Sequence, residues 1–363
     1  MASSRIPPAK AVRVIEAARY FLSRLHARTF PAPAVLMEMV MNAWVAQAIT
    51  AAADLGIADA LADGPLSAQD LAVAVDADAD ALARLLRALI SRGIFRQRRD
   101  GRYELTRLAQ PLRRDADVSL AAWARWMGSP ENRDHWSHLS ESLRHGECVA
   151  CQARGQSLFE FLAGQPELQE VFNQAMTGVS EISIAPLVAA YDFTPYATIV
   201  DVGGGRGRLL AAMLTAAPRA RGVLFDQPHV VIDAPAELRK HRVLDRVRIA
   251  EGSFFDDDIP AGGDAYVLKN VIHDWPDEQA VRILSNVRAS SSAGKHLLLV
   301  ELVIPAHRRE FAGKWLDLEM FVSATSRERT ADEYGRLLAR SGFQLNRVVE
   351  TVSPFSVVEA IAV

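Results

Sequence analysis

The segment Thr198-Ile-Val-Asp-Val-Gly-Gly-Gly-Arg-Gly-Arg208 joins an apolar run to a glycine-rich turn. The apolar run predicts a buried strand, and a helix is predicted over 209–217, directly after the turn. Glycines at positions 203, 205 and 207 let the backbone approach a ligand closely, and the N–H groups that begin the helix are free to bind it. The dinucleotide-binding fingerprint would need a glycine at the position of Arg208. The segment therefore predicts a nucleotide-type cofactor site outside the dinucleotide pattern.

A second strand, predicted over 221–226, ends in the carboxylate of Asp226. In a doubly wound sheet, an acidic side chain at this distance from the glycine turn reaches the ribose hydroxyls of a bound nucleotide. Asp226 could instead only cap the turn that follows it, because Pro228 comes two residues later. Next to the glycine turn, ribose binding is the better interpretation.

Strands and helices alternate from Ala197 to the C-terminus. Strands are predicted near 198–203, 221–226, 246–251, 264–270, 295–303, 343–350 and 354–363, with helices between them until the last pair. This alternation predicts an α/β fold with a doubly wound, seven-stranded, mostly parallel sheet that is covered on both faces. The short Ser353-Pro354 connection cannot cross over the sheet, so the last strand is predicted to be antiparallel.

The N-terminal part is predicted to be helical and to contain a winged helix. Helices are predicted over 43–61, from Ser67, and over 80–92, and a short hairpin over 94–106 follows them. A winged helix can bind DNA, and the hairpin carries four arginines: Arg96, Arg98, Arg99 and Arg102. Acidic residues at positions 76, 78 and 80 border the expected recognition helix, so a dimerisation module is the better interpretation. The segment 120–191 that follows has a helical pattern throughout.

The composition is that of an ordinary globular chain, with 363 residues, 50% hydrophobic and 23% charged. The formal net charge of -3 argues against general nucleic-acid binding. No secretory signal is visible, and the most apolar run, 39–53, is too short to span a bilayer. We expect a cytoplasmic protein that binds neither nucleic acid nor membrane.

The two cysteines form a C-x-x-C motif, Cys148 and Cys151, downstream of His135, His138 and His145. Cysteine and histidine are the ligands that zinc prefers, so a metal cluster is conceivable. A single C-x-x-C lacks the second pair of a zinc finger, and it does not lie in the βαβ context of a redox motif. We expect reduced thiols and no metal.

His273 and Asp274 lie just beyond the predicted end of a strand near Asn270, at the edge where open α/β sheets place their sites. Glu301 lies on the next strand, and Glu328 lies in a charged loop before a helix. A histidine flanked by carboxylates is an oriented general base, because one acid fixes the tautomer and stabilises the imidazolium that forms. The His-Asp pair could also serve only as a cap before Pro276.

Four segments carry a family resemblance. They are Val200-Asp-Val-Gly-Gly-Gly-Arg-Gly207, Phe225-Asp-Gln-Pro-His-Val230, Lys269-Asn-Val-Ile-His-Asp-Trp275 and Arg327-Glu-Arg-Thr330. In order and spacing they resemble the S-adenosylmethionine-dependent O-methyltransferases of the caffeate and hydroxyneurosporene type. The similarity covers nearly the whole chain, including the winged helix. It is specific for the family and says little about the substrate.

The resemblance implies roles for individual residues. The cofactor would be bound by Gly203, Gly205, Asp226, Ser253, Phe254, Lys269 and Ser180. His273 would be the base, with Glu301 and Glu328 as its flanking acids. The acceptor pocket would include Phe172, Met176, Asp274, Trp275 and Met320, although aromatic residues at helical spacing are more often core. The family usually has Asp at the position of Ser253 and Gly-Gly in place of Thr325-Ser326, which puts one adenine contact and the shape of that loop in doubt.

The implied function is methyl transfer from S-adenosyl-L-methionine to a hydroxyl of a small aromatic or polyene metabolite, with S-adenosyl-L-homocysteine as product. Alignment and a positioned histidine suffice for this in-line displacement, so no metal is expected. We expect a homodimer formed through domain 1–115, a helical region 116–190 that contributes to the acceptor pocket, and a cofactor domain 191–363. Two alternatives remain open: a relative that uses the cofactor for a hydroxylase-like reaction, and a winged-helix regulator that binds DNA.

Overall fold

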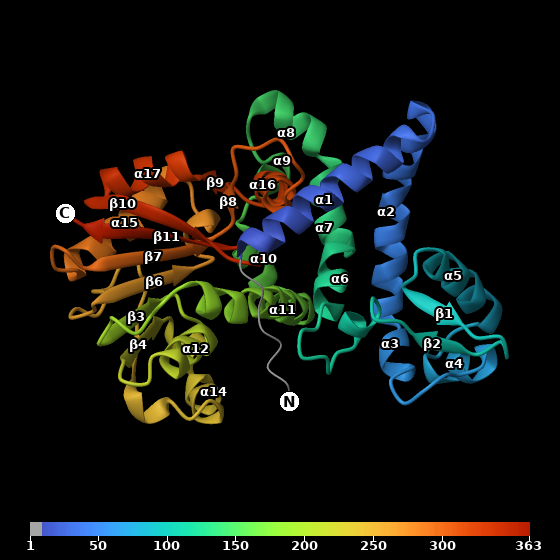
Figure 1. Cartoon of the computed structure of the whole chain (residues 1–363), viewed down its shortest axis with the longest axis horizontal. Helices are drawn as coiled ribbons and strands as arrows, with labels where there is room; N and C mark the ends of the chain where they lie inside the picture. Colours follow the sequence, from blue (N-terminus) through green and yellow to red (C-terminus); the bar gives the residue numbers. More distant parts are fainter. Residues whose placement is uncertain (1–8) are drawn as a thin grey trace. The chain divides into compact units, whose positions relative to one another are not determined.

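The computed structural model describes residues 9–363 (Figure 1). The chain forms two compact units. One comprises residues 21–182, and the other combines residues 183–363 with the N-terminal segment that ends at Tyr20. Two helices run from one unit into the other, α1 (Ala9–Arg28) and α11 (Pro166–Ala190).

The C-terminal unit is built on a seven-stranded sheet with the order β10-β11-β7-β6-β3-β4-β5. Its strands are β3 (Thr198–Val202), β4 (Arg221–Asp226), β5 (Val247–Glu251), β6 (Ala265–Lys269), β7 (His296–Glu301), β10 (Phe343–Glu350) and β11 (Ser356–Ala362). Strands β5, β4, β3, β6 and β7 pair in parallel, whereas β11 is antiparallel to both β7 and β10. The predicted seven-stranded sheet with an antiparallel last strand is confirmed.

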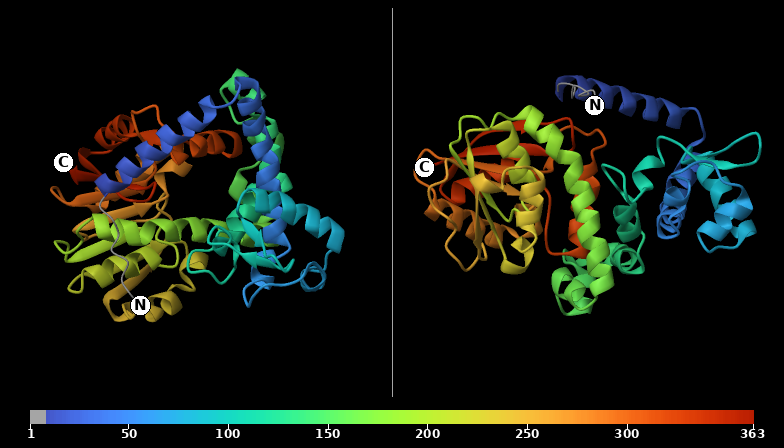
Figure 2. Two further views of the ribbon diagram at one scale, coloured as in Figure 1. Left: turned by 45° about the vertical axis from the view of Figure 1, so that its right-hand side comes forward. Right: turned by 90° about the horizontal axis from the view of Figure 1, so that it is seen from below.

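Helices cover both faces of this sheet, as Figures 1 and 2 show. On one face, α15 (Asp277–Ser290) and α17 (Ala331–Arg340) share a buried core with Phe225 of β4 and Leu299 of β7. On the other face, α12 (Arg208–Ala216) packs over β4, where its Leu210 and Leu214 would lie 3.0 Å from a Cβ atom on Gly222. The remaining elements of the unit are α13 (Pro228–Val231), α14 (Ala234–Lys240), η2 (Leu244–Arg246), η3 (Ile272–Asp274), β8 (Val303–Ile304), α16 (Ala312–Ser323) and β9 (Arg329–Thr330).

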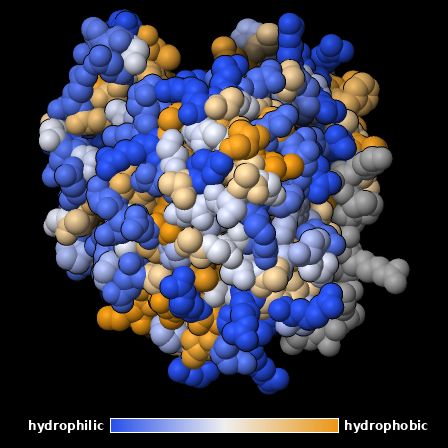
Figure 3. Space-filling view, turned by 90° about the vertical axis from the view of Figure 1, so that its left-hand side faces the viewer, coloured by the Kyte–Doolittle hydropathy of each residue, from blue (hydrophilic) through white to orange (hydrophobic). Residues whose placement is uncertain are grey.

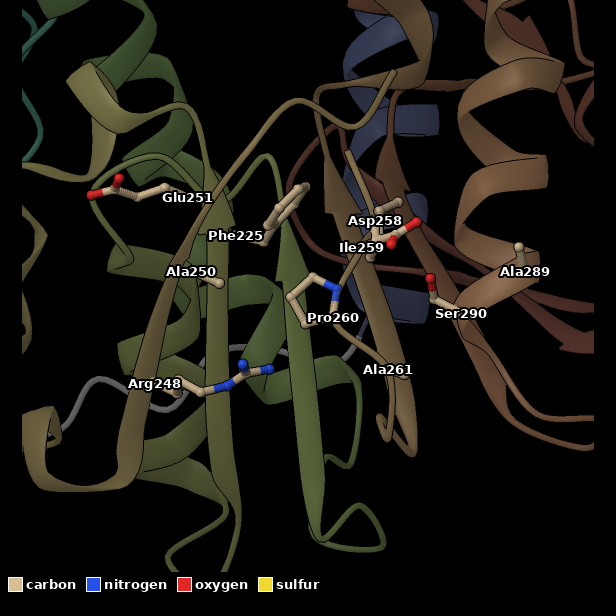
Figure 4. A pocket seen from close by; sticks show the side chains of 10 residues that line it. All are labelled: Phe225, Arg248, Ala250, Glu251, Asp258, Ile259, Pro260, Ala261, Ala289 and Ser290. Atoms are coloured by element: carbon tan, nitrogen blue, oxygen red, sulfur yellow. The ribbon is translucent and has the colours of Figure 1, made fainter. Parts of the chain in front are cut away.

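The prediction of a helix in each of the earlier connections is wrong for residues 252–264, between β5 and β6. Pro260 has no N–H to donate, and Gly262 has a positive φ of 89°, so this stretch cannot continue as a helix. The missing helix leaves a cavity of about 530 Å³ lined by β5, this loop and the end of α15 (Figure 4). Neither the predicted cofactor residues nor the predicted catalytic residues line this cavity.

In the N-terminal unit, the predicted order of helices followed by a hairpin is confirmed. The elements are α2 (Ala32–Asp54), α3 (Ile57–Ala60), α4 (Ala68–Ala74), α5 (Ala79–Ser91), β1 (Phe95–Gln97) and β2 (Tyr103–Leu105). The Ser67 and Asp78 side chains cap α4 and α5 by accepting backbone N–H bonds. On the hairpin, Arg98 lies 2.6 Å from Glu104, and Arg96 contacts the same carboxylate. Much of the positive charge of the wing is therefore neutralised within the hairpin.

The segment after the hairpin is helical, as predicted. It contains η1 (Gln110–Leu112), α6 (Ala121–Met127), α7 (Pro130–Ser137), α8 (Leu139–His145), α9 (Val149–Arg154), α10 (Leu158–Ala163) and α11. A small core forms around Trp126, which is 3% exposed, together with Leu158 and Leu162. The Phe172 ring packs edge-on against Trp126, with the ring centroids 5.0 Å apart. Trp126 is therefore a core residue of this unit.

Helix α2 begins at Ala32 and has 23 residues, so the expectation that its apolar run is too short to span a bilayer is wrong. Judged by length and composition alone, the helix could cross a membrane, and only 6% of its most apolar window is buried. Its exposed side chains include Met37, Val40 and Trp44. In contrast, the face of the molecule in Figure 3 is mainly hydrophilic with small apolar patches. Exposed apolar surface of this kind is typical of a binding surface, so we expect α2 to pack against a partner.

The expectation of two reduced thiols is wrong, because Cys148 and Cys151 form a disulfide. Cys148 caps α9, and one helical turn brings the Cα atom of Cys151 within 5.2 Å of its own. His135, which could have belonged to a metal cluster, instead contacts Arg154 at 3.0 Å. Burial and this guanidinium lower the pKa of His135 to about 4.

Candidate active site

The glycine-rich turn follows directly from the end of β3, where the strand is buried. Gly203, Gly205 and Gly207 have φ values of 69°, 59° and 80°, a backbone conformation that favours glycine. A Cβ atom on Gly205 would meet nothing within 4 Å, so the turn is open on that side. A Cβ atom on Gly204 would lie 2.5 Å from Leu224 and 2.7 Å from the carboxyl carbon of Asp201. The turn thus combines an open backbone with a packed underside.

Asp226 lies at the end of β4, next to the glycine turn. Its Oδ2 accepts a hydrogen bond from the N–H of Gly205 at 2.8 Å, and its Oδ1 accepts one from the N–H of Gln227 at 2.7 Å. The second bond is local, to the adjacent residue, and helix α13 that follows has no side-chain cap. The first bond joins two segments about twenty residues apart. Asp226 therefore helps to shape the cofactor turn.

Asp201, in the middle of the buried strand β3, was not singled out from the sequence. It is 1% exposed, and its Oδ2 has no hydrogen-bond partner among the described residues. Burial raises the pKa of Asp201 to about 7, and the nearby Asp226 adds to this while Lys269 opposes it. A carboxylate oxygen without a hydrogen-bond partner next to the glycine turn fits a ligand that carries an amino group, as S-adenosylmethionine does. An acid within an apolar strand was the signal that could have identified it.

Aromatic side chains lie beside the turn. The Phe254 ring approaches within 3.6 Å of the position that a Cβ atom on Gly203 would occupy. Trp275 packs edge-on against Phe254 and Phe255, at centroid distances of 6.2 and 4.7 Å. The Ser253 hydroxyl accepts the N–H of Phe255 at 3.2 Å and so shapes this loop locally. The structure therefore brings Gly203, Phe254 and Trp275 into one neighbourhood.

His273 lies in the short 3₁₀ turn η3, just past the end of β6. Its Nδ1 lies 2.9 Å from Oε1 of Glu328 and 4.0 Å from Oε2 of Glu301, and its Nε2 lies 3.3 Å from Oδ1 of Asp274. The His273 side chain is 15% exposed, and the side chains of Glu301 and Glu328 are buried. Because a carboxylate only accepts hydrogen bonds, Nδ1 carries the proton of the contact with Glu328. The opposite ring nitrogen, Nε2, is then the one that can take up a further proton.

The charges of this cluster change its proton affinities. Burial alone would lower the pKa of His273, but Asp274, Glu328 and Glu301 outweigh burial and hold that pKa well above its ordinary value. Burial raises the pKa of Glu301 to about 7, although the attraction of His273 opposes the shift. The acids thus favour the protonated imidazole, and the fraction of the basic form increases as the pH rises through the raised pKa.

Two acidic side chains, Glu301 and Asp317, hold the backbone around the cluster. Oε1 of Glu301 accepts the N–H groups of Val271 and Ile272 at 3.2 and 2.9 Å. On α16, Asp317 accepts the N–H of Glu328 at 3.0 Å, and burial raises the pKa of Asp317. Asp317 was not identified from the sequence, because its contact depends on how α16 packs against a distant loop.

The geometry of His273, Glu301 and Glu328 would also admit a metal ion, because one ligand atom from each lies within 4.8 Å of the others. However, Glu301 already accepts two backbone N–H bonds, and Glu328 already contacts Nδ1. These contacts give both carboxylates a function without a metal. Metal independence stays a prediction.

Four other predicted acceptor and cofactor residues lie on two helices, and Lys269 ends a strand. Phe172, Met176 and Ser180 are spaced along α11 within the N-terminal unit, where Phe172 and Met176 pack against the core around Trp126. Met320 lies on α16, one turn after Asp317. Lys269, at the end of β6, places its Nζ 5.5 Å from the centre of the Phe355 ring.

Comparison with known proteins relates nearly the whole chain to one family of methyltransferases. Residues 136–344 match the family model of the O-methyltransferase domain, and residues 37–115 match that of the O-methyltransferase dimerisation domain. A phenazine O-methyltransferase of Lysobacter antibioticus is 42% identical over 330 residues, which cover 91% of this chain and 96% of that protein.

Solved structures with the same architecture include a mitomycin 7-O-methyltransferase. It is 35% identical, has a TM-score of 0.83, and the match covers 93% of this chain and all of the other. An O-methyltransferase from neocarzinostatin biosynthesis was solved with S-adenosylmethionine and 2-hydroxy-5-methyl naphthoic acid. It is 33% identical with a TM-score of 0.73, over 88% of this chain and 96% of that one.

Replacing Gly204 with Ala should weaken both folding and cofactor binding. The added methyl group would overlap Leu224 and Asp201, so the turn has to move. We expect a loss of about 1–3 kcal/mol in unfolding free energy, typical of overpacked sites, and a raised Kd for S-adenosylmethionine in calorimetry. Gly335→Ala is the matched control, because its Cβ atom has ordinary space on α17. Wild-type affinity in Gly204→Ala would contradict the assignment of the turn.

Proposed function

The chain belongs to the S-adenosylmethionine-dependent O-methyltransferases, and on this premise we propose that His273 is the base that activates the acceptor hydroxyl. One observation carries the proposal: the contact of Nδ1 with the buried Glu328 leaves Nε2 as the proton-accepting atom. Asp274, 3.3 Å from Nε2, is close enough to contact the same hydroxyl.

When bound, S-adenosylmethionine supplies a methyl group on a positively charged sulfur that leaves as a neutral thioether. Nε2 of His273 would take the proton of the acceptor hydroxyl, which makes that oxygen the nucleophile. Glu328 and Glu301 stabilise the positive charge that the imidazole gains, since both carboxylates lie within 4.0 Å of Nδ1. This proton transfer needs no metal.

We propose that the cofactor lies over Gly203 and Gly205, with Asp226 at the ribose, Ser253 and Phe254 at the adenine, and Lys269 and Ser180 at its polar end. Support comes from the open backbone at Gly205 and from the position of Phe254 beside Gly203. Asp201 is added to this set, because its buried and unpaired Oδ2 suits the amino group of the cofactor.

We propose a hydroxylated aromatic or polyene acceptor, bounded by Asp274, Trp275 and Met320 and by Phe172 and Met176 of α11. The named acceptors of similar proteins, a phenazine and a naphthoic acid, are aromatic. The complete set of His273, Glu301 and Glu328 argues against a hydroxylase-like reaction, because such a reaction has no need of this base.

We further propose that the protein is a cytoplasmic homodimer formed through domain 1–115, with 116–190 contributing to the acceptor pocket of the cofactor domain 191–363. The match to a dimerisation domain begins at residue 37, on the helix α2 that exposes Met37, Val40 and Trp44. A second copy of the chain would cover this apolar surface.

His273→Ala should lower the rate of methyl transfer on the order of a hundredfold or more and leave cofactor affinity unchanged, since the base does not contact the glycine turn. The measurement is label transfer from methyl-labelled S-adenosylmethionine to a panel of phenols and aromatic amines, with calorimetry for the cofactor. His241→Ala is the control, because that histidine pairs with Glu237 on α14.

Dialysis of the wild type against a chelator should leave the rate unchanged. Full turnover in His273→Ala would remove this residue from the mechanism. Label found only on amines, or a chelator-sensitive rate, would contradict the proposed reaction.

The pH profile tests the charge of the cluster. Because the carboxylates raise the pKa of His273, the basic form is lost as the pH falls through a value above the ordinary 6.5. We expect kcat/KM to rise with pH through that raised value, and the midpoint to move to lower pH in Glu328→Gln, which keeps a hydrogen-bonding oxygen but loses the negative charge. An unchanged midpoint in Glu328→Gln would contradict this account.

Val40→Asp should halve the mass of the protein in solution, because it places a charge in the proposed interface. Light scattering coupled to size exclusion measures the mass. Val73→Asp is the matched control, since Val73 is 83% exposed and lies on α4, outside the helix α2. A wild-type mass in Val40→Asp, or a monomeric wild type, would rule out this interface.

A further inference from the structure

Arg329 is the largest side chain that is fully buried among the described residues, with 1% of its surface exposed. It lies on β9, directly after Glu328. Its Nη1 donates to the carbonyl oxygen of Ile272 at 2.9 Å, and its Nη2 donates to that of Trp275 at 2.8 Å. Nε and Nη2 also reach Oδ1 of Asp277, at 3.1 and 2.8 Å.

The two carbonyl groups bracket His273 in the turn η3. This turn has weak hydrogen bonds of its own: the N–H of Asp274 reaches Val271 at 3.3 Å, and that of Trp275 reaches Ile272 at 3.4 Å. Short 3₁₀ turns have poor hydrogen-bond geometry in general. The position of His273 therefore depends on groups outside the turn.

Those groups hold the turn from two sides. Glu301 accepts the N–H groups of Val271 and Ile272 at the start of the turn, while Arg329 donates to carbonyl oxygens at its start and end. The backbone carbonyl of His273 itself accepts the N–H of Arg327 at 3.1 Å. A planar guanidinium can serve two carbonyls and a carboxylate at fixed angles, which the ammonium of a lysine cannot do.

We propose that Arg329 is a positioning residue for methyl transfer, which holds the main chain on both sides of His273 so that Nε2 faces the acceptor hydroxyl. This inference rests on the proposed role of His273 as the base. A surface ion pair with Asp277 would not require burial of the guanidinium, and burying a charge is costly unless its donors are satisfied. Here two of its donors are satisfied by the backbone of the turn.

Arg329→Lys tests the proposal, because lysine keeps a positive charge for Asp277 but cannot span both carbonyls. We expect kcat to fall on the order of a hundredfold, as misplacement of a reacting group by about 1 Å can do, with little change in acceptor KM or in the Kd of S-adenosylmethionine. Arg340→Ala is the matched control, because Arg340, like Arg329, pairs with an acidic residue of α15, but its partner Glu278 is exposed. It should keep the wild-type kcat.

Two further readouts separate positioning from general damage to the fold. In Arg329→Ala, millimolar guanidinium should restore part of kcat, whereas equal sodium chloride should not. In His273→Ala, adding Arg329→Lys should not lower the residual rate further, because both changes act through the same proton transfer. Wild-type kcat in Arg329→Lys, or an additive loss in the double variant, would overturn the inference. If His273→Ala is itself active, the proposed base fails instead, so the two failures are distinguishable.

Discussion

The contact between Nδ1 of His273 and the buried carboxylate of Glu328 is the interaction on which the chemistry depends. It fixes which nitrogen is free to accept a proton. Within the cluster, burial lowers the pKa of the imidazole while the neighbouring carboxylates raise it. The carboxylates prevail, so the cluster increases the basicity of His273.

The fold supplies this contact by bringing strand ends together. His273 follows β6, Glu301 ends β7, and the cofactor turn follows β3, so all three lie at the carboxyl edge of neighbouring parallel strands. Glu328 comes from a loop outside the sheet, and Asp317 and Arg329 anchor that loop and the turn η3 by backbone hydrogen bonds. The sheet thus places the groups, and the buried charges orient them.

Sequence patterns predicted the seven strands, the antiparallel last strand and the order of the winged helix, because these follow from local periodicity and turn residues. The absence of a helix over 252–264 was missed, since alternation alone does not reveal one irregular connection. The Cys148–Cys151 disulfide and the buried roles of Asp201 and Arg329 were also missed. Each depends on which groups meet in space. Only Asp201 had a local clue, because it is an acidic residue within an apolar strand.

Titration of the His273 ring by nitrogen NMR tests the central claim most directly, with His273→Asn to assign its signals among the nine histidines. The account predicts a midpoint above 6.5 and, in the neutral form, a proton on Nδ1. A midpoint below 6.5, or a neutral ring protonated on Nε2, would contradict it, because the imidazole would then lack either the basicity or the free nitrogen that proton removal requires.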